Sequence, residues 1–381
     1  MHIQNFYNMD TQITQRLKSL DILRGFDLFM LVFFQPVFAG LIRTMDLPFG
    51  DTLLYQFNHE EWAGFRAWDL VMPLFLFMSG VSMPFAFSKF RQMSDKSAVY
   101  KRILKRVVLL FILGAVVQGN LLDLDMHRLR LYSNTLQAIA VGYLISTIIF
   151  LHLPSMRAQL LAAVALLLLY WAPMTFLGDF TPEGNFAEKV DRLALGRFRD
   201  GVRWAEDGTW AFSPRYQYTW IISSLTFGVT VLMGVMAGGV MKNGANRNRN
   251  ALTLLIAGVA CIAISLLWSL QMPIIKKIWT SSMTLYSGGW CLLLMALFYY
   301  IIDCRGYSKG LNWLKIYGMN SITAYVLGQV INFRDVVNSV FHGFEQFMGA
   351  EYYKVWLTFG NYMIIFLILH ILYKRNIFLR V

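Results

Sequence analysis

The sequence predicts an all-α, polytopic membrane protein with about ten transmembrane helices in a single domain of residues 1–381. Of the 381 residues, 57% are hydrophobic and only 15% are charged, whereas a soluble protein carries about 25% charged residues. Several windows contain roughly 20 consecutive apolar residues, the length of helix that crosses a bilayer core. The predicted spans lie at residues 22–43, 67–88, 104–122, 134–152, 158–177, 218–241, 250–270, 282–302, 314–333 and 355–373.

The charge pattern predicts that both termini lie in the cytoplasm. Segments assigned to the cytoplasm, such as residues 89–106, are rich in Lys and Arg, whereas the outside segments hold most of the Asp and Glu. This asymmetry follows the positive-inside rule. It accounts for the net charge of +12 without a nucleic-acid partner, and it places His59 outside.

The first predicted span carries charged groups on one helical face. The preceding polar residues lack the apolar centre of a cleavable signal peptide, so we expect this span to stay in the mature protein. Asp21, Arg24 and Asp27 follow at intervals of three and can pair along the helix. Asp21 and Arg24 can be explained by their position at the start of the helix, where an acid is stabilised by the helix dipole and an arginine can reach the interface. Asp27 lies deeper, which indicates a structural or substrate-side ion pair. Gln35 and Pro36 add a polar group and a predicted kink.

The second predicted span contains residues that permit bends and close packing. Pro73 and Pro84 flank a Ser79-Gly80 pair, and small residues let membrane helices approach closely. We therefore expect a packing role for Ser79, Gly80 and Ser82.

A cluster of cations begins the third predicted span. These cations cover one side of a helix end at the cytoplasmic surface, which favours a role in topology and in contact with anionic lipid. Binding of a phosphate-rich cofactor is the second interpretation. The cluster comprises Lys101, Arg102, Lys105 and Arg106.

Three further stretches carry polar groups of possible functional use. Residues 133–137 place amides and hydroxyls at the outer end of the fourth span, where they can bond between helices or line a cavity. Residues 178–217 form the longest extramembrane piece, which predicts a folded lid or binding element. Residues 271–281 keep Lys276, Lys277 and Trp279 outside against the usual charge bias, which suggests contact with an anionic substrate.

Other site signals are few. Asn320 and Ser321 begin the ninth span, where they can cap a helix or bond between helices. The spacing of His and Cys predicts no metal site, and there is no nucleotide-binding glycine loop. The three cysteines lie in no outside segment, and no N-glycosylation sequon occurs, so both observations fit a bacterial inner membrane.

The stretch from Asn58 to Pro73 is the strongest candidate for chemistry. It places His59 and several carboxylates before a long apolar run. Histidine suits proton transfer near neutral pH, and a carboxylate such as Asp69, entering an apolar segment, is costly unless it is paired or functional. The alternative is an interfacial histidine in an aromatic belt, and position alone favours that alternative.

Several stretches in this order resemble the heparan-alpha-glucosaminide N-acetyltransferase family and its bacterial relatives. They are RLKSLDILRGFDLFMLVFF, FNHEEWAGFRAWDLVMPLFLFMSGVS, NTLQAIAVGYL, TPEGNFAEKVDRLALG, PIIKKIWTSSM and YGMNSITAYVL. The resemblance implies a multi-span enzyme that uses cytoplasmic acetyl-CoA to acetylate a sugar amine on the opposite side. It implies a catalytic role for His59 and Asp69, and a homodimer is also expected from the family.

The resemblance has matches and departures at single positions. The start of the family pattern falls on Ser19, Asp21, Arg24 and Gly25. Gln35 stands where the animal enzyme has an asparagine and a broader group of membrane acyltransferases has a histidine. Residues 326–329 read Val-Leu-Gly-Gln where the animal enzyme has a histidine nearby.

Acetyl transfer from a thioester to an amine needs a base and donors for the developing oxyanion. We expect His59 to act as the base or as an acetyl carrier, oriented by Asp69. Candidate substrate or oxyanion contacts are Gln35, Asn58, Trp62, Asn134, Gln137, Lys276 and Trp279. Candidate contacts to acetyl-CoA are Arg24, Lys101, Arg102, Lys105, Arg106 and Asn320.

Two other functional classes remain open from the residues alone. A proton-coupled small-molecule transporter would use Asp27, Asp69 and His59 as a proton relay. A membrane scaffold without chemistry is the other, although the number of intramembrane polar groups argues against it.

Overall fold

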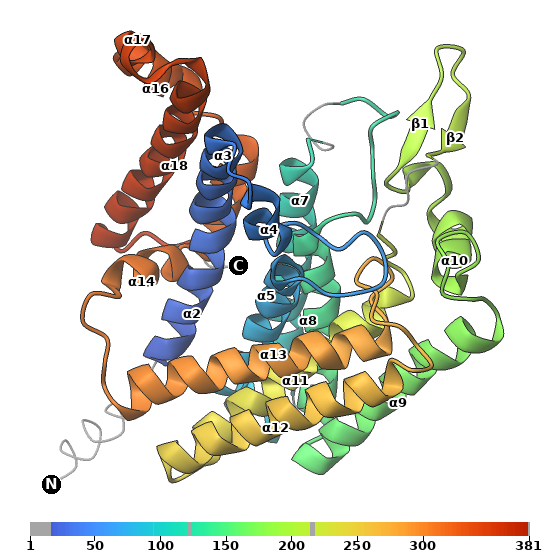
Figure 1. Ribbon diagram of the computed structural model, residues 1–381. Helices are drawn as coiled ribbons and strands as arrows, with labels where there is room; N and C mark the ends of the chain where they lie inside the picture. The colour runs from blue at the N-terminus through green and yellow to red at the C-terminus, as the bar shows by residue number, and fades with distance from the viewer. Residues whose placement is uncertain (1–16, 94, 120–123, 214–217, 380–381) are drawn as a thin grey trace, which may run out of the picture.

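The computed structural model describes residues 17–93, 95–119, 124–213 and 218–379, which form a helical bundle and one small hairpin (Figure 1). Within these residues, eight helical stretches are long and apolar enough to cross a membrane. A multi-pass, essentially all-α membrane protein is thus confirmed. The stretches are Lys18–Met45, Ala67–Arg91, Thr135–His152 (α8), Met156–Phe176 (α9), Ser223–Asn243 (α11), Arg247–Trp268 (α12), Ser281–Cys304 and Ala350–Lys374 (α18).

Three of these stretches are composite. The first joins α2 (Lys18–Phe29) and α3 (Gln35–Met45) through a π-helical turn, η1 (Met30–Phe34). The second comprises η2 (Ala67–Leu70), α5 (Val71–Val81), α6 (Met83–Phe87) and η3 (Ser88–Gln92). The seventh joins α13 (Ser281–Phe298) to the π-helical η5 (Tyr299–Cys304). The kink predicted at Pro36 thus takes the form of a π-helical turn just before the proline. Proline has no backbone N–H, so the regular helical hydrogen-bond pattern is interrupted there.

Two of the ten predicted spans take another form. The span at 104–122 is α7 (Ser97–Val117), and its first half carries the 101–106 cations, so it lacks a long charge-free apolar stretch. The span at 314–333 breaks at Asn320 into α14 (Asn312–Met319) and α15 (Ser321–Val330). At ~1.5 Å per residue neither half crosses an apolar core of about 30 Å alone.

Helix α7 nevertheless runs the full length of its neighbour α8. Near its start, Tyr100 Oη lies 2.6 Å from His152 Nε2 at the end of α8. Just beyond its end, the Gln118 amide donates to the Ser133 carbonyl, which precedes α8. The two helices are therefore antiparallel and connect the same two ends of the bundle. We call the end that carries His59 and Ser133 the His59 end.

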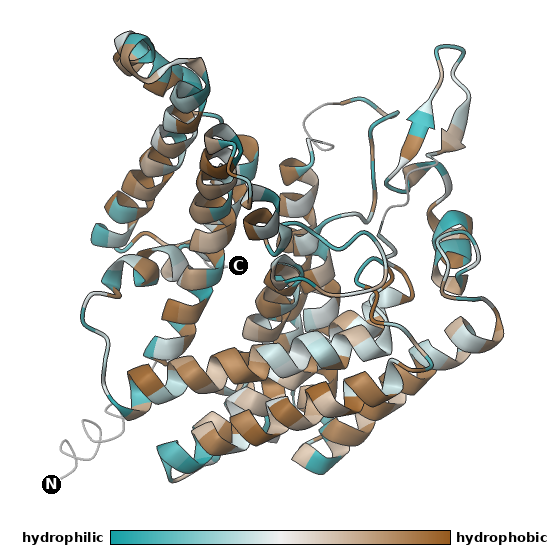
Figure 2. Cartoon of the chain, viewed as in Figure 1, coloured by the Kyte–Doolittle hydropathy of each residue, from teal (hydrophilic) through white to brown (hydrophobic). Residues whose placement is uncertain are grey.

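Short elements connect the long helices at the His59 end. They include α10 (Phe186–Leu195) and an antiparallel hairpin, which pairs Val202 with Phe212 and Trp204 with Trp210 and stands out from the bundle in Figure 1. Figure 2 shows that α10 and part of the hairpin are hydrophilic, whereas the long helices are mostly hydrophobic. The remaining elements are α4 (Gly50–Tyr55), α10 (Phe186–Leu195), η4 (Gly196–Phe198), β1 (Val202–Trp204), β2 (Trp210–Phe212), α16 (Arg334–Phe341), η6 (His342–Phe344) and α17 (Glu345–Met348).

Glycines bring α5 and α11 into backbone contact. A Cβ on Gly80 would lie 1.9 Å from the Val231 carbonyl oxygen, and one on Gly234 would lie 2.0 Å from that of Phe77. Gly234 and Gly238 form the small-xxx-small pattern that permits this approach. The predicted packing role of Gly80 is therefore observed, and it fixes the helix that follows the His59 loop.

Replacing Gly234 with Ala should destabilise the protein, because the new methyl group cannot fit against the Phe77 carbonyl. We expect a loss of about 1–3 kcal/mol, measured as a lower melting temperature in detergent. Gly239→Ala is the control, since its Cβ would meet only Met156 Cε, at 3.6 Å. Equal melting temperatures for the two variants would contradict the proposed close contact.

Candidate functional site

The loop that carries His59 is fastened to two distant segments. Gly64 has φ of +133°, a conformation that a residue with a Cβ rarely adopts. Its N–H donates to the Ile274 carbonyl at 2.8 Å, and the adjacent Ala63 forms a β-bridge with Ile275. The Trp62 indole N–H donates to the Phe180 carbonyl at 2.8 Å. These contacts dock the loop beside Lys276.

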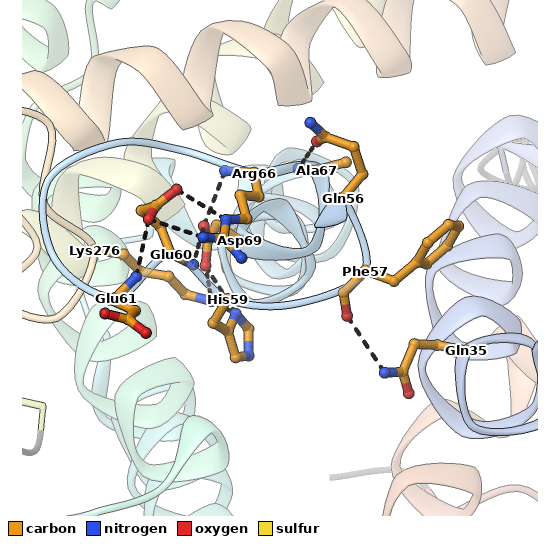
Figure 3. A network of polar contacts seen from close by, with 10 residues as sticks. All are labelled: Gln35, Gln56, Phe57, His59, Glu60, Glu61, Arg66, Ala67, Asp69 and Lys276. Carbon is orange, nitrogen blue, oxygen red and sulfur yellow. Dashed lines mark hydrogen bonds and ion pairs between the residues drawn. The ribbon is translucent and has the colours of Figure 1, made fainter. Parts of the chain in front are cut away.

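The Asp69 carboxylate is the centre of the polar network in Figure 3. Its Oδ1 lies 2.8 Å from His59 Nδ1 and 3.2 Å from Lys276 Nζ. Its Oδ2 accepts the backbone N–H groups of Glu60 at 3.2 Å and Arg66 at 3.0 Å. The Asp69 side chain is only 1% exposed, so these donors replace the water that it loses on burial.

The same geometry determines which His59 nitrogen is free. An ionised carboxylate only accepts hydrogen bonds, so the contact with Asp69 places the proton on Nδ1. Lys276 Nζ also lies 3.1 Å from Nδ1, and with Nδ1 protonated this ammonium donates to Asp69 instead of to the ring. The lone pair of the neutral ring is then on Nε2. The His59 side chain is 47% exposed and borders a cavity, so Nε2 is available to a reactant.

Burial, helped by the charge of Lys276, favours the neutral form of the His59 ring. Burial lowers the pKa of His59 below the ordinary value of 6.5, the Asp69 hydrogen bond opposes this, and the Lys276 charge lowers the pKa further. Burial lowers the pKa of Lys276 to about 8, with Asp69 opposing, so its ammonium form predominates at neutral pH. A neutral histidine beside a buried cation can act as a base at pH 7.

A second ion pair stiffens the loop. The Arg66 guanidinium donates to both Glu60 carboxylate oxygens, at 2.9 and 3.1 Å, and stacks 4.1 Å from the centre of the Tyr55 ring. Glu60 and Arg66 also donate their backbone N–H groups to Asp69. Their ion pair therefore fixes the positions of the two N–H groups that bind the Asp69 carboxylate.

The His59 cavity has a volume of about 360 Å³ and is lined by both polar and aromatic groups. Three residues predicted from the sequence line it, namely His59, Asn134 and Lys276. Ser133 and Thr135, from the polar stretch 133–137 that was expected to bond between helices or line a cavity, line it as well. Its other polar lining residues, which the sequence did not single out as site residues, are Gln118, Arg130, Asp200, Tyr218, Tyr325 and Gln329. In the described residues no cluster of three His, Cys, Asp or Glu side chains could hold a metal ion.

Three residues that we expected to contact substrate instead hold the loop. The Gln35 amide donates to the Phe57 carbonyl at 3.3 Å, and the Asn58 amide donates to the Leu54 carbonyl at 3.1 Å. With Trp62, which is bonded to Phe180, they do not line the His59 cavity. Their hydrogen bonds fix the position of the histidine.

Two other expected contacts are also structural. Gln137 accepts the Ser133 N–H at 2.8 Å and is buried. Trp279 is 1% exposed, packs edge-on against Phe227 at 4.8 Å and lies 3.4 Å from the Thr230 hydroxyl. This buried indole packs in the core and anchors the loop that presents Lys276.

A second cavity of about 300 Å³ shares lining residues with the first. It is lined by Arg24 and Arg106, and it shares Phe75, Thr135 and Tyr325 with the His59 cavity. These three side chains form a common wall between the two cavities. We call this second space the arginine cavity.

Of the six expected contacts to acetyl-CoA, only Arg24 and Arg106 line the arginine cavity. Arg106 stacks 4.1 Å from the centre of the Tyr143 ring, and its buried Nε has no hydrogen-bond partner among the described residues. Asn320 is buried and donates to the Ile316 carbonyl, and Asp27, of the possible proton relay, lines neither cavity. The other three expected contacts are exposed and do not line the arginine cavity, namely Lys101, Arg102 and Lys105.

Lys276→Met should raise the pKa of His59, because it removes a positive charge that disfavours the imidazolium. Lys277→Met should raise it less, since the Lys277 charge is the weaker influence. Side-chain NMR titration of the histidines, with His59→Asn for assignment, measures both. An unchanged or lower pKa in Lys276→Met would contradict the electrostatic account.

Comparison with known proteins finds a family match to the first part of the chain. Residues 16–182, which include His59 and Asp69, match the family model described as heparan-alpha-glucosaminide N-acetyltransferase, catalytic. The human heparan-alpha-glucosaminide N-acetyltransferase is 24% identical over 361 residues, covering 82% of this chain and 52% of the human protein. The mouse protein of the same name is 22% identical over 367 residues, covering 83% and 54%.

The chain spans about half the length of these curated relatives. The matched segment begins just before α2 and ends after α9, so it contains the His59 loop and the opening of α8. By this segment, the chain is similar to the catalytic part of the heparan-alpha-glucosaminide N-acetyltransferase family.

Proposed function

We propose that the protein is a membrane-bound acetyltransferase that moves an acetyl group from acetyl-CoA to the amine of a sugar. The observation that carries the proposal is the His59–Asp69 pair, with a free Nε2 on a cavity that shares a wall with the arginine cavity. One cavity offers a base, and the other offers cations for phosphates. The family match supports the same reaction class.

The two cavities suit two substrates that arrive from opposite faces of the membrane. We infer that the His59 end faces outward and that the termini lie in the cytoplasm, in accord with the excess of Lys and Arg in segments 89–106 and 242–249. Acetyl-CoA would then enter from the cytoplasm, and its phosphates would contact Arg24 and Arg106. Its thioester arm would pass the wall of Phe75, Thr135 and Tyr325 to reach His59.

Acetyl transfer at this site needs one proton movement and one charge to be stabilised. The acceptor nitrogen attacks the thioester carbonyl, and His59 Nε2 takes a proton from that nitrogen. The Lys276 ammonium and the Asn134 amide line the cavity and are the donors for the developing oxyanion. The C–S bond then breaks, and the CoA thiolate takes the proton from His59. The same Nε2 is the atom that would carry the acetyl group in a two-step transfer.

Asp69 supports the base without contacting a reactant. Its hydrogen bond holds Nδ1 protonated and directs Nε2 to the cavity, as the carboxylate does in other histidine-based sites. It also favours the imidazolium that forms after proton transfer. Glucosamine and short amino-sugar oligomers are the acceptors we propose, because the named function of the relatives is transfer to a glucosaminide.

His59→Ala should reduce acetyl transfer to glucosamine at least about 100-fold, which is the lower range for loss of a general base. Asp69→Asn should lower kcat more than it weakens acetyl-CoA binding. Purified protein in detergent with radiolabelled acetyl-CoA gives both readings. His342→Ala is the control, because that side chain is exposed at the surface. Turnover of His59→Ala at the wild-type rate would remove this histidine from the mechanism.

Arg106→Gln should weaken acetyl-CoA binding, and the loss should shrink at high salt, because the lost contact is between charges. We expect a change of about tenfold in the dissociation constant at low salt, measured by calorimetry. Lys105→Gln is the matched control, since it removes an adjacent charge on α7 that lies outside the arginine cavity. Equal losses in both variants would mean that these cations act only through the general surface potential.

A further inference from the structure

Asp200 is a second carboxyl group on the wall of the His59 cavity. It lies between η4 and β1 and is 7% exposed. Among the described residues, its side chain receives one hydrogen bond, from the Trp220 indole N–H to Oδ1 at 3.2 Å. Tyr218 and Trp220 line the same cavity, so Asp200 belongs to an acidic, aromatic part of the wall.

The surroundings of Asp200 hold it in place without neutralising it. Arg199, the nearest cation in sequence, forms an ion pair with Glu188. Its one hydrogen bond to Asp200 goes to the backbone carbonyl, at 3.0 Å, and not to the carboxylate. Asp191 accepts the backbone N–H groups of Trp220, at 2.7 Å, and of Ile221, at 3.0 Å. In the described part of the chain, no cation lies within ion-pair distance of the Asp200 carboxylate.

Burial has an electrostatic consequence for Asp200. It raises the pKa of this carboxyl to about 7, while the charges of Arg199 and Arg130 oppose the rise and that of Asp191 adds to it. A carboxylate whose charge is costly in this way gains from a cation that enters the cavity. His59 is kept neutral, and the cations among the described lining residues are Lys276, which Asp69 already pairs, and Arg130, which is exposed to solvent.

The proposed reaction itself requires a second proton acceptor. A sugar amine near neutral pH is largely an ammonium, and its nitrogen must lose two protons to become an amide. His59 passes one of them to the CoA thiolate. The other must leave before the attack, because an ammonium has no lone pair.

We propose that Asp200 binds the ammonium of the acceptor in the His59 cavity and takes its first proton. The Asp200 carboxylate and the ammonium become a carboxylic acid and a neutral amine, which then attacks the thioester. The carboxylic acid later returns its proton to water, so the overall reaction releases one proton. This inference rests on the proposed acetyltransferase function, and it selects amine over hydroxyl acceptors. Asp200 lies beyond the matched residues 16–182.

Asp200→Asn tests this role, because an asparagine oxygen still accepts the Trp220 hydrogen bond while the charge is lost. We expect the KM for glucosamine to rise about tenfold or more, with acetyl-CoA affinity and melting temperature unchanged. Asp200→Glu should recover part of the loss. Asp207→Asn is the matched control, since Asp207 lies in the hairpin turn and bonds only to Thr209 among the described residues. An unchanged KM in Asp200→Asn overturns the proposal.

A binding measurement separates this proposal from the proposed function. If the wild-type protein transfers no acetyl group to any amine, the acetyltransferase proposal fails. Calorimetry then compares glucosamine with the neutral N-acetylglucosamine at pH 7. The role of Asp200 in binding ammonium is upheld if the wild type prefers glucosamine and Asp200→Asn loses that preference. It is overturned if the wild type shows no preference or if the variant retains it.

Discussion

The site depends on the burial of one carboxylate. Asp69 sits at the first turn of a membrane-entering helix and is almost fully removed from water. A charge in that position is stable only if donors surround it, and here the donors come from three places: the His59 ring, the backbone of the loop at 60–66, and Lys276. The hydrogen bonds that the buried Asp69 carboxylate requires therefore bring the loop, the histidine and the lysine together in one site.

The helices make that assembly rigid. The close contact of α5 with α11, which Gly80 and Gly234 permit, places the helix behind Asp69 against the centre of the bundle. The buried Trp279 holds the loop that presents Lys276. A base works best when its orientation is set before the reaction, because reorganisation then costs little at the transition state.

Two cavities that share a wall give the protein an arrangement suited to two chemically different substrates. One cavity is lined by Arg24 and Arg106, whereas the other is lined by His59, Lys276 and Asp200. Among the described residues, Phe75, Thr135 and Tyr325 are the side chains that border both cavities. A rotation of such side chains is a smaller change than a movement of whole helices. In the proposed reaction, such a rotation would let the acyl-carrying arm pass from one cavity to the other.

Local pattern in the sequence was enough for the multi-pass helical class, for the interruption near Pro36 and for His59 and Asp69 as a pair, which lie only 10 residues apart. Lys276 could be selected because a cation there departs from the charge bias. Tertiary structure alone decided that Lys276 reaches Asp69 across 207 residues, and that α14 and α15 are separate short helices. It also decided that Trp62 and Trp279 are anchors and that Asp200 faces the cavity. Hydropathy and residue spacing indicate whether a segment is helical and which of its faces is apolar. Contacts between segments that are distant in the sequence depend on how the helices pack, and no local sequence pattern determines that packing.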